Sequence, residues 1–460
     1  MTQQTGAWRE LLATGRLAQF ITLCLGVWLH AADSFLAATA LPQAVREIGG
    51  VAVINWAVGL YQLGAIVSGT AVGVMARKLG MQRVLVIAAV CYGLGCVASA
   101  VAPEMVTMLT GRLVQGIGGG MMIALTYVAT QRMFPEHLWV RLLAIVATIW
   151  GVSALCGPLI GGAFAAVGLW RGAFWAFAAQ AGLLVVAALT LLRNLPEGPR
   201  EVPGWPWPAL LVLSLATLAI ATAGIAAPVS AAVLGAGGVG LLYAAARLDA
   251  RSPVRLMPAE VLRPLHPVGS GLVMVLTLAI GFVVFPAYGP LLLQLQFGTN
   301  PLTAGYIVAS LSVAWTLGTL ATSGASPSAE TQLIRFGAVL ITLGGIGLSV
   351  FIGSGPLFAI VLCVLAQGAG AGACWPFVVK RIVAAAPENE RDLAASAASS
   401  IQRMGYAIGA SASGIAANAA GLAANPTPET AARAGTLVFA CCIPVLLVGC
   451  LGAWGLTRRR

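Results

Sequence analysis

Charged residues are scarce in this chain. Only 8% of its 460 residues are Asp, Glu, Lys or Arg, whereas soluble domains carry about 25%. Apolar residues make up 59% of the sequence, and the mean hydropathy is +0.93. Such a chain has too little polar surface to fold in water, so the composition predicts an integral membrane protein.

Residue groupings that bind metals or perform catalysis are also missing. The nine Cys and three His show none of the spacings of a metal site, and the adjacent Cys441 and Cys442 are poorly placed to form a disulfide. No cluster of His, Asp and Glu and no Ser–His arrangement falls within the apolar stretches. The sequence therefore predicts no metal, no cofactor and no enzymatic activity.

Long apolar runs account for most of the chain. A helix that crosses a bilayer needs about 20 mainly apolar residues. The runs that meet this length cover residues 17–41, 53–76, 83–102, 105–131, 140–167, 170–192, 208–226, 229–246, 268–294, 301–323, 332–353, 356–379, 393–421 and 434–456. The expected fold class is an all-α polytopic membrane protein with fourteen transmembrane helices and no soluble domain.

The basic residues, which give a net charge of +11, are unevenly distributed. If the N-terminus is cytoplasmic, 20 of the 25 Lys and Arg lie on the cytoplasmic side, and only Arg46, Arg171 and Arg433 lie outside. Cytoplasmic loops of membrane proteins are enriched in these residues. The asymmetry predicts that both termini are cytoplasmic and that the positive charge serves membrane topology, not nucleic-acid binding.

Glycine-rich patterns recur at a fixed distance. The segment Gln115-Gly-Ile-Gly-Gly-Gly120 is matched 252 residues later by Gln367-Gly-Ala-Gly-Ala-Gly372, and the next run of each half also repeats its glycines. Repeated halves are typical of secondary transporters. We expect an N-terminal six-helix bundle (1–195), an inserted helix pair (196–250) and a C-terminal six-helix bundle (251–460), with the inserted pair at the periphery.

Asp33 is the one carboxylate that lies well inside an apolar run, and we expect no other acid to be deeply buried. A charged side chain at a helix centre in the bilayer costs at least ~2.5–3.5 kcal/mol, so it normally faces a partner or a hydrated cavity. Burial disfavours the charged form of a carboxyl group. We therefore predict a proton or cation site; a hydrated Asp at a helix end is the plainer alternative.

Three further polar residues lie in apolar runs. His30 is one turn before Asp33 on the same helix face; it could share a proton with Asp33 or bond to a neighbouring backbone group. Arg112 needs a partner or water, unless it extends from a helix end to the interface. Arg403 belongs to a polar patch in the thirteenth run that lines a cavity or packs at an interface.

Four segments resemble motifs of one family, in the family's order. They are Ala32–Pro42, Gly73–Arg83, Leu109–Gly116 and Gly151–Gly162. The family is the major facilitator superfamily, specifically its fourteen-span drug:proton antiporter branch, and the resemblance covers the whole chain. It implies a proton-coupled secondary transporter that exports amphipathic organic compounds (drugs) by alternating access. Asp33 would be the coupling site, assisted by His30 and Arg112.

The resemblance also implies functional positions. The gating motifs contribute Gly73, Arg77, Gly80, Arg83, Gly151, Gly157, Pro158 and Gly161. The expected substrate contacts are Asp33, Phe35, Tyr61, Gln115, Trp150, Phe282, Tyr288, Trp375, Arg403 and Tyr406, because aromatic groups around one carboxylate suit bulky amphipathic cations. The family usually has Asp at the position of Arg77, and Thr and Asn at those of Phe35 and Ala38. The inner gate is therefore altered and the pocket more apolar.

Two other functions stay open. Export of an organic anion would use the buried basic groups Arg112, Arg403 and His30, which outnumber the single buried acid. A non-transporting membrane scaffold is the other. The expected partners are a small-molecule substrate, protons and the lipid bilayer of a bacterial inner membrane. A periplasmic adaptor protein has no support in the sequence.

The charge asymmetry can be tested directly. Reporter fusions at the C-terminus and in successive loops should report fourteen crossings, with both ends of the chain in the cytoplasm. A C-terminus outside the cell, or a count of twelve crossings, would contradict this topology.

Overall fold

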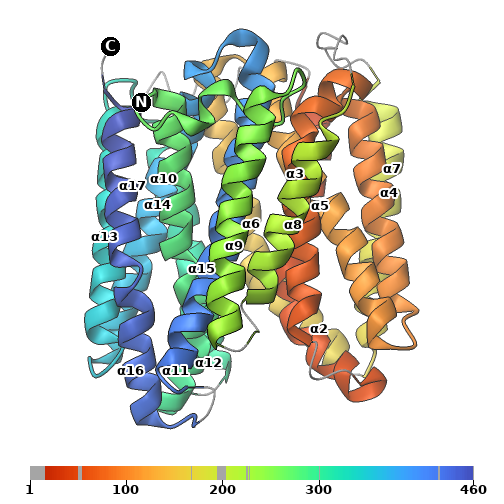
Figure 1. The fold of residues 1–460 in the computed structure, drawn as a ribbon. Helices are drawn as coiled ribbons and strands as arrows, with labels where there is room; N and C mark the ends of the chain where they lie inside the picture. The colour runs from red at the N-terminus through yellow and green to blue at the C-terminus, as the bar shows by residue number, and fades with distance from the viewer. Residues whose placement is uncertain are drawn as a thin grey trace. The chain divides into compact units, whose positions relative to one another are not determined.

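The computed structural model describes residues 16–49, 54–166, 168–193, 204–223, 226, 228–299, 301–422 and 425–458 (Figure 1). Within these ranges all regular structure is helical, and no strand is present. The sequence prediction of an all-helical protein is therefore confirmed. By its internal contacts the chain divides into two compact units, which we describe one at a time.

The first unit comprises Met1–Leu210, Ser252–Met257 and Pro387–Ser400. Its long helices are α2 (Leu17–Ile48), α3 (Ile54–Leu79), α4 (Met81–Ala100), α5 (Met105–Met133), α6 (Glu136–Ala166) and α7 (Trp170–Leu191). Helix α5 packs against α2, α3, α4 and α6. It is the most buried of the candidate membrane-crossing helices, and its polar side chains Arg112, Gln115, Thr126 and Thr130 are buried.

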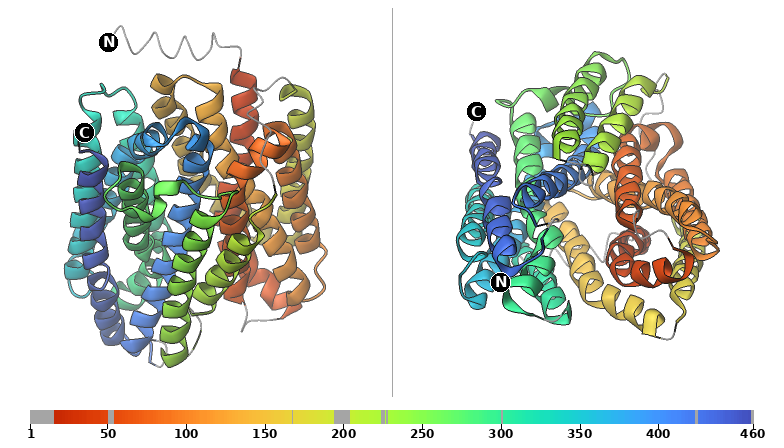
Figure 2. Two further views of the ribbon diagram at one scale, coloured as in Figure 1. Left: turned by 45° about the horizontal axis from the view of Figure 1, so that its top comes forward. Right: turned by 60° about the horizontal axis from the view of Figure 1, so that its bottom comes forward.

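The second unit comprises Leu211–Arg251, Pro258–Ala386 and Ile401–Arg460. Its helices are α8 (Trp207–Ala223), α9 (Pro228–Arg251), η2 (Ala259–Leu262), α10 (Pro267–Phe282), α11 (Val284–Phe297), α12 (Pro301–Thr322), α13 (Glu330–Phe351), α14 (Leu357–Ala385), α15 (Arg391–Ala419), α16 (Pro428–Ala440) and α17 (Ile443–Leu456), of which α8 and α15 begin in the first unit. Helix α14 packs against α10, α12, α13 and α17, and α13 lies beside α17 (Figure 2).

Twelve stretches of the described helices are long and apolar enough to cross a membrane. Helices α10 and α11 together form one of them, as do α16 and α17. Two predicted spans are not among the twelve. Helix α8 has only 17 residues, and α15 contains charged residues and serines that lower its hydropathy. Helices therefore form where fourteen runs were predicted, but the fourteen membrane crossings stay a prediction.

The repeated glycines make matching contacts within each unit. A Cβ atom on Gly120 of α5 would overlap the backbone of Ala65 in α3, and one on Gly372 of α14 would overlap the backbone of Trp315 in α12. Small residues let membrane helices approach closely. The pair α3–α5 thus has a counterpart in α12–α14, as a duplication requires. The division into six, two and six helices stays a prediction.

The close packing of α5 against α3 at Gly120 can be tested by its effect on stability. Gly120→Ala should lower the free energy of unfolding by about 1–3 kcal/mol, because the added methyl group meets backbone that must shift. Gly182→Ala in α7 is the matched control, since nothing lies within 4 Å of the position of its Cβ. Thermal unfolding in detergent should show a lower Tm for Gly120→Ala only. Equal Tm values for both variants would contradict the close packing.

Candidate functional site

Asp33 lies midway along α2 and is fully buried in an ion pair. Nη1 of Arg112, on α5, donates to Oδ1 of Asp33 at 2.9 Å and to Oδ2 at 2.8 Å. Arg112 is itself only 1% exposed. Neither residue reaches a hydrated helix end, and each neutralises the charge of the other. Removing one partner of such a pair leaves an uncompensated buried charge, at a cost of ~3–5 kcal/mol.

Gln115 links this ion pair to α4. Its Nε2 donates to Oδ1 of Asp33 at 3.3 Å and to Sγ of Cys96 at 3.1 Å. Its Oε1 accepts from Nη1 of Arg112 at 3.3 Å and from the Ser99 hydroxyl at 3.2 Å. The amide is fully buried. Since both ends of the amide have partners, Gln115 holds the carboxylate and the guanidinium in one orientation.

Aromatic rings adjoin the same arginine. The guanidinium of Arg112 lies 4.4 Å from the centre of the Tyr61 ring, and its Nε donates to the carbonyl of Ala57 at 3.3 Å. The Tyr61 hydroxyl and Nδ1 of His30 are 2.6 Å apart. The edge of Trp150 meets the His30 ring, with the ring centres 5.7 Å apart. A continuous series of contacts therefore connects Asp33 to His30 through Arg112 and Tyr61.

The structure brings six of the predicted residues into this cluster. They are His30, Asp33, Tyr61, Arg112, Gln115 and Trp150. Sequence reasoning missed the contribution of α4, where Cys96 and Ser99 bond to Gln115 and the Tyr92 hydroxyl donates to the backbone carbonyl of Leu29 in α2 at 3.2 Å. The positions i, i+4 and i+7 of Tyr92, Cys96 and Ser99 on one helix face were the available signal. Phe35 lies outside the part of the chain whose side chains are described.

Asp33 is not the only deeply buried acid, and that expectation was wrong. Asp249, Glu330 and Asp392 are 3%, 7% and 9% exposed. Each of them lies in the first or last turn of its helix, whereas Asp33 lies mid-helix. Glu330 is paired with Lys380, whose Nζ lies 2.6 Å from Oε1. The packing of helix ends against other segments buries these acids, and hydropathy along the chain does not report such packing.

A second charged cluster joins the ends of α3 and α5 to the start of α15 and to the short helix η3 (Glu388–Glu390) before it, all within the first unit. Nε of Arg132 donates to Oδ1 of Asp392 at 2.8 Å, and its Nη2 contacts Oδ2. The Gln131 side chain also donates to Asp392. Arg77 donates from Nη1 to the backbone carbonyl of Asn389 at 3.3 Å. Asp392 thus accepts bonds from two side chains of α5.

The gating-motif residues have different surroundings. A Cβ atom on Gly73 would lie 2.9 Å from Oγ of Ser396 and 3.1 Å from the backbone oxygen of Asp392, so the lack of a side chain helps α3 lie close to α15. Gly80 separates α3 from α4 with a φ of +82°, a conformation that favours glycine. Arg83 is exposed and Gly151 is buried in α6. The remaining motif residues, Gly157, Pro158 and Gly161, lie outside the part whose side chains are described.

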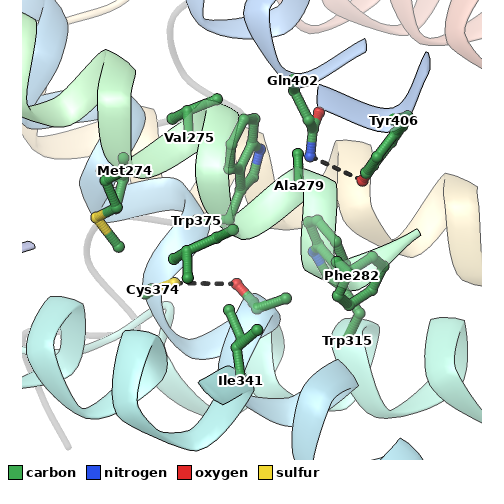
Figure 3. A pocket seen from close by; sticks show the side chains of 13 residues that line it. Met274, Val275, Ala279, Phe282, Trp315, Ile341, Cys374, Trp375, Gln402 and Tyr406 are labelled. Carbon is green, nitrogen blue, oxygen red and sulfur yellow. Dashed lines mark hydrogen bonds between the residues drawn. The ribbon is translucent and has the colours of Figure 1, made fainter. Parts of the chain in front are cut away.

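The second unit contains a small aromatic cavity of about 30 Å³ (Figure 3). Phe282 lies between Trp315 and Tyr406, with ring centres 5.2 and 6.4 Å away, and Trp375 meets Trp315 at 6.2 Å. Nε2 of Gln402 donates to the Tyr406 hydroxyl at 3.1 Å. No charged side chain is among the described residues that line it.

Three predicted substrate contacts, Phe282, Trp375 and Tyr406, line this cavity, whereas Tyr288 and Arg403 do not. Sequence reasoning missed the amide of Gln367, the counterpart of Gln115 in the repeat. Gln367 is fully buried, and neither atom of its amide has a hydrogen-bond partner among the described residues. The repeated glycine-rich pattern was the signal that could have identified it.

Comparisons with known proteins agree with this architecture. Residues 23–361 match the model of the Major Facilitator Superfamily. A probable multidrug-efflux transporter of Mycobacterium tuberculosis is 31% identical over 440 residues, which cover 90% of each chain. The solved structure of the proton:xylose symporter XylE has a TM-score of 0.69 at 14% identity, covering 97% of this chain and 96% of its own.

The human organic anion transporter MFSD10 (TETRAN) has a TM-score of 0.68 at 15% identity, covering 96% of this chain and 99% of its own. These two structures share the fold of this chain. The family model covers more than half of the sequence, and the mycobacterial relative matches nearly all of it. The chain is therefore a polytopic integral membrane protein that belongs to the major facilitator superfamily.

Proposed function

We propose that this protein is a proton-coupled exporter of amphipathic organic compounds that works by alternating access, with Asp33 as the coupling residue. The observation that carries the proposal is the buried contact of Asp33 with Arg112 and Gln115. The similarity to the mycobacterial relative, a probable multidrug-efflux transporter, supports the substrate class. Both termini are proposed to lie in the cytoplasm of a bacterial cell.

Protonation of Asp33 would change what holds α2 against α5. In the charged form, both carboxylate oxygens accept bonds from Arg112. A proton on the carboxyl group removes the negative charge, so the ion pair would weaken to a neutral hydrogen bond, while Arg112 keeps its contacts with Gln115, Ala57 and Tyr61. A proton can shift a conformational equilibrium only if it binds the two conformations with different affinity. The ion pair is therefore the element through which we expect proton binding to act.

The aromatic cavity of the second unit is the proposed contact for the apolar part of the substrate. Its rings offer stacking surfaces, and the described residues of its lining carry no charge. In this conformation its volume of about 30 Å³ holds only one or two water molecules. A drug-sized compound therefore requires the helices around it to separate, as alternating access implies.

The contact between Arg132 and Asp392 is the proposed gate. The related gating motif usually has Asp at the position of Arg77, whereas here the carboxylate belongs to α15 and the guanidinium groups belong to α3 and α5. A basic residue therefore lies on α3 where the family usually has an acid, and it donates to a backbone carbonyl just before α15. Breaking this contact is the expected first step in separating α15 from α3 and α5.

No described contact favours export of an organic anion. Arg112, one of the three basic groups on which that alternative depends, is neutralised by Asp33. Arg403 does not line the aromatic cavity and has an interaction partner within the structure. An anionic substrate would have to displace a carboxylate that is held by both oxygens.

Substitution of Asp33 tests the coupling role. Asp33→Asn should abolish export of ethidium driven by a pH gradient in proteoliposomes, because the carboxyl group that exchanges the proton is gone. The change is nearly isosteric, but it leaves Arg112 buried without its counter-charge and should cost ~3–5 kcal/mol of stability. Stability and transport must therefore be measured together.

The matched control is the double variant Asp33→Asn with Arg112→Gln, which removes both charges. It should unfold at a higher temperature than Asp33→Asn alone and still show no coupled export. If the more stable double variant exports ethidium with the same dependence on the pH gradient as the wild type, the proton travels elsewhere and the proposal is wrong.

Substitution of Asp392 tests the gate. Asp392→Asn should lower the free energy of unfolding by about 2 kcal/mol, because hydrogen bonds to a charged group are lost at a largely buried position. Glu429→Gln is the control: Glu429 is 83% exposed and lies 3.9 Å from Arg433, so its loss should change little.

Exchanging the gate charges gives a second measurement. The variant with Arg132→Asp and Asp392→Arg should recover part of the stability that either single change removes, and a double-mutant cycle would report the coupling. Strictly additive effects of the two changes on Tm would show that the two side chains do not stabilise each other.

A further inference from the structure

A second, larger cavity lies in the second unit, where α10 begins and α17 ends. Its volume is about 660 Å³. The lining residues are Leu262, Arg263, Pro264, Leu265, His266, Pro267, Gly455 and Arg458. Three of the lining side chains can carry positive charge, and none is acidic. This cavity is separate in sequence and lining from the Asp33 cluster and from the aromatic cavity.

The two arginines of this cavity are available to a ligand. Arg263 and Arg458 are both exposed, and neither side chain has an ion pair or hydrogen bond with another described residue. His266 accepts a hydrogen bond at Nδ1 from the backbone of Val268, so the neutral imidazole carries its hydrogen on Nε2. The cavity thus offers two guanidinium groups and one N–H donor, which together suit an anion with several oxygen atoms.

A third arginine reinforces the positive charge beside the cavity. Nε of Arg335, on α13, donates to the hydroxyl of Thr457 at 2.9 Å, one residue before Arg458. Its guanidinium also lies 5.5 Å from the centre of the Trp454 ring. Arg335 is therefore held at the end of α17 by two contacts. Its charge adds to those of the two cavity arginines.

An apolar stripe on α17 leads to this basic end. Leu447, Leu451 and Trp454 are 50%, 71% and 42% exposed, and their spacing places them on one face of the helix. Leu265, in the cavity lining, is 90% exposed. In an integral membrane protein such a stripe faces lipid chains, and Trp is enriched where the chains meet the headgroups. Hydrocarbon contact and positive charge therefore meet at this cavity.

We propose that this cavity binds the phosphate headgroup of an anionic phospholipid, with its acyl chains along the stripe of α17. Arg263 and Arg458 contact the phosphate oxygens, and Nε2 of His266 donates to the headgroup. Basic pockets beside transmembrane helices are suited to such headgroups. A free phosphate ion offers the same oxygens, but it leaves the apolar stripe and Leu265 uncovered. The bound lipid bridges α10 and α17, which pack together.

The test compares lipids on the full-length purified protein in detergent. Phosphatidylglycerol should raise the Tm and remain bound in native mass spectrometry, whereas phosphatidylcholine and inorganic phosphate at equal concentration should do neither. In the variant with Arg263→Ala and Arg458→Ala, phosphatidylglycerol affinity should fall roughly 30-fold, about 5-fold for each arginine. Arg251→Ala, an exposed arginine outside the cavity lining, is the control and should bind like the wild type.

A variant that keeps both positive charges distinguishes a loss of lipid binding from a loss of folding. With Arg263→Lys and Arg458→Lys the protein should retain most of the lipid selectivity, because an ammonium group still attracts the phosphate. Undiminished binding of phosphatidylglycerol to the double alanine variant would overturn the proposal. So would an equal Tm increase with inorganic phosphate, which would identify an ion site that does not recognise lipid.

Discussion

The ion pair between Asp33 and Arg112 is the interaction on which the first unit depends. It places two opposite charges where water does not reach, between α2 and α5, and such a pair is tolerable only if its remaining hydrogen-bonding groups are satisfied. Gln115 and Ala57 supply those partners, and Tyr61 covers the guanidinium. The contacts of this ion pair and of Gln115 involve α2, α3, α4 and α5. A change of charge at Asp33 would therefore alter contacts of all four helices.

The two units have similar glycine-mediated helix packing but different polar side chains beside it. Glycines at equivalent positions bring α5 against α3 and α14 against α12. In the first unit the helix that carries these glycines, α5, also carries Arg112, whereas the position 252 residues later, in α14, is Val364. At the corresponding place the second unit has an aromatic cavity and the amide of Gln367, which has no hydrogen-bond partner among the described residues. The two units thus share close glycine packing but differ in the polar side chains that lie beside it.

Several site residues were predictable because they are conspicuous in sequence. Asp33 and Arg112 lie inside apolar runs, where a charged side chain has a high free-energy cost and therefore indicates function. Both belong to the buried ion-pair cluster. Asp392 was not conspicuous in sequence, because it lies in a polar segment where a carboxylate is expected to be hydrated. Only the packing against α5 makes it a buried charge. Arg403 was singled out for the same reason as Arg112, yet it does not line the aromatic cavity.

The sequence by itself determined the membrane class, the helical regions and the repeat, because hydropathy and glycine spacing are properties of neighbouring residues. Only the tertiary structure decided which charges meet. Arg112 reaches Asp33 across 79 residues of chain, and Arg132 reaches Asp392 across 260. The sequence showed that Arg112 required a partner and could not name it. The reason is physical. A buried charge needs an opposite charge nearby, and the packing of the helices determines which residue supplies it.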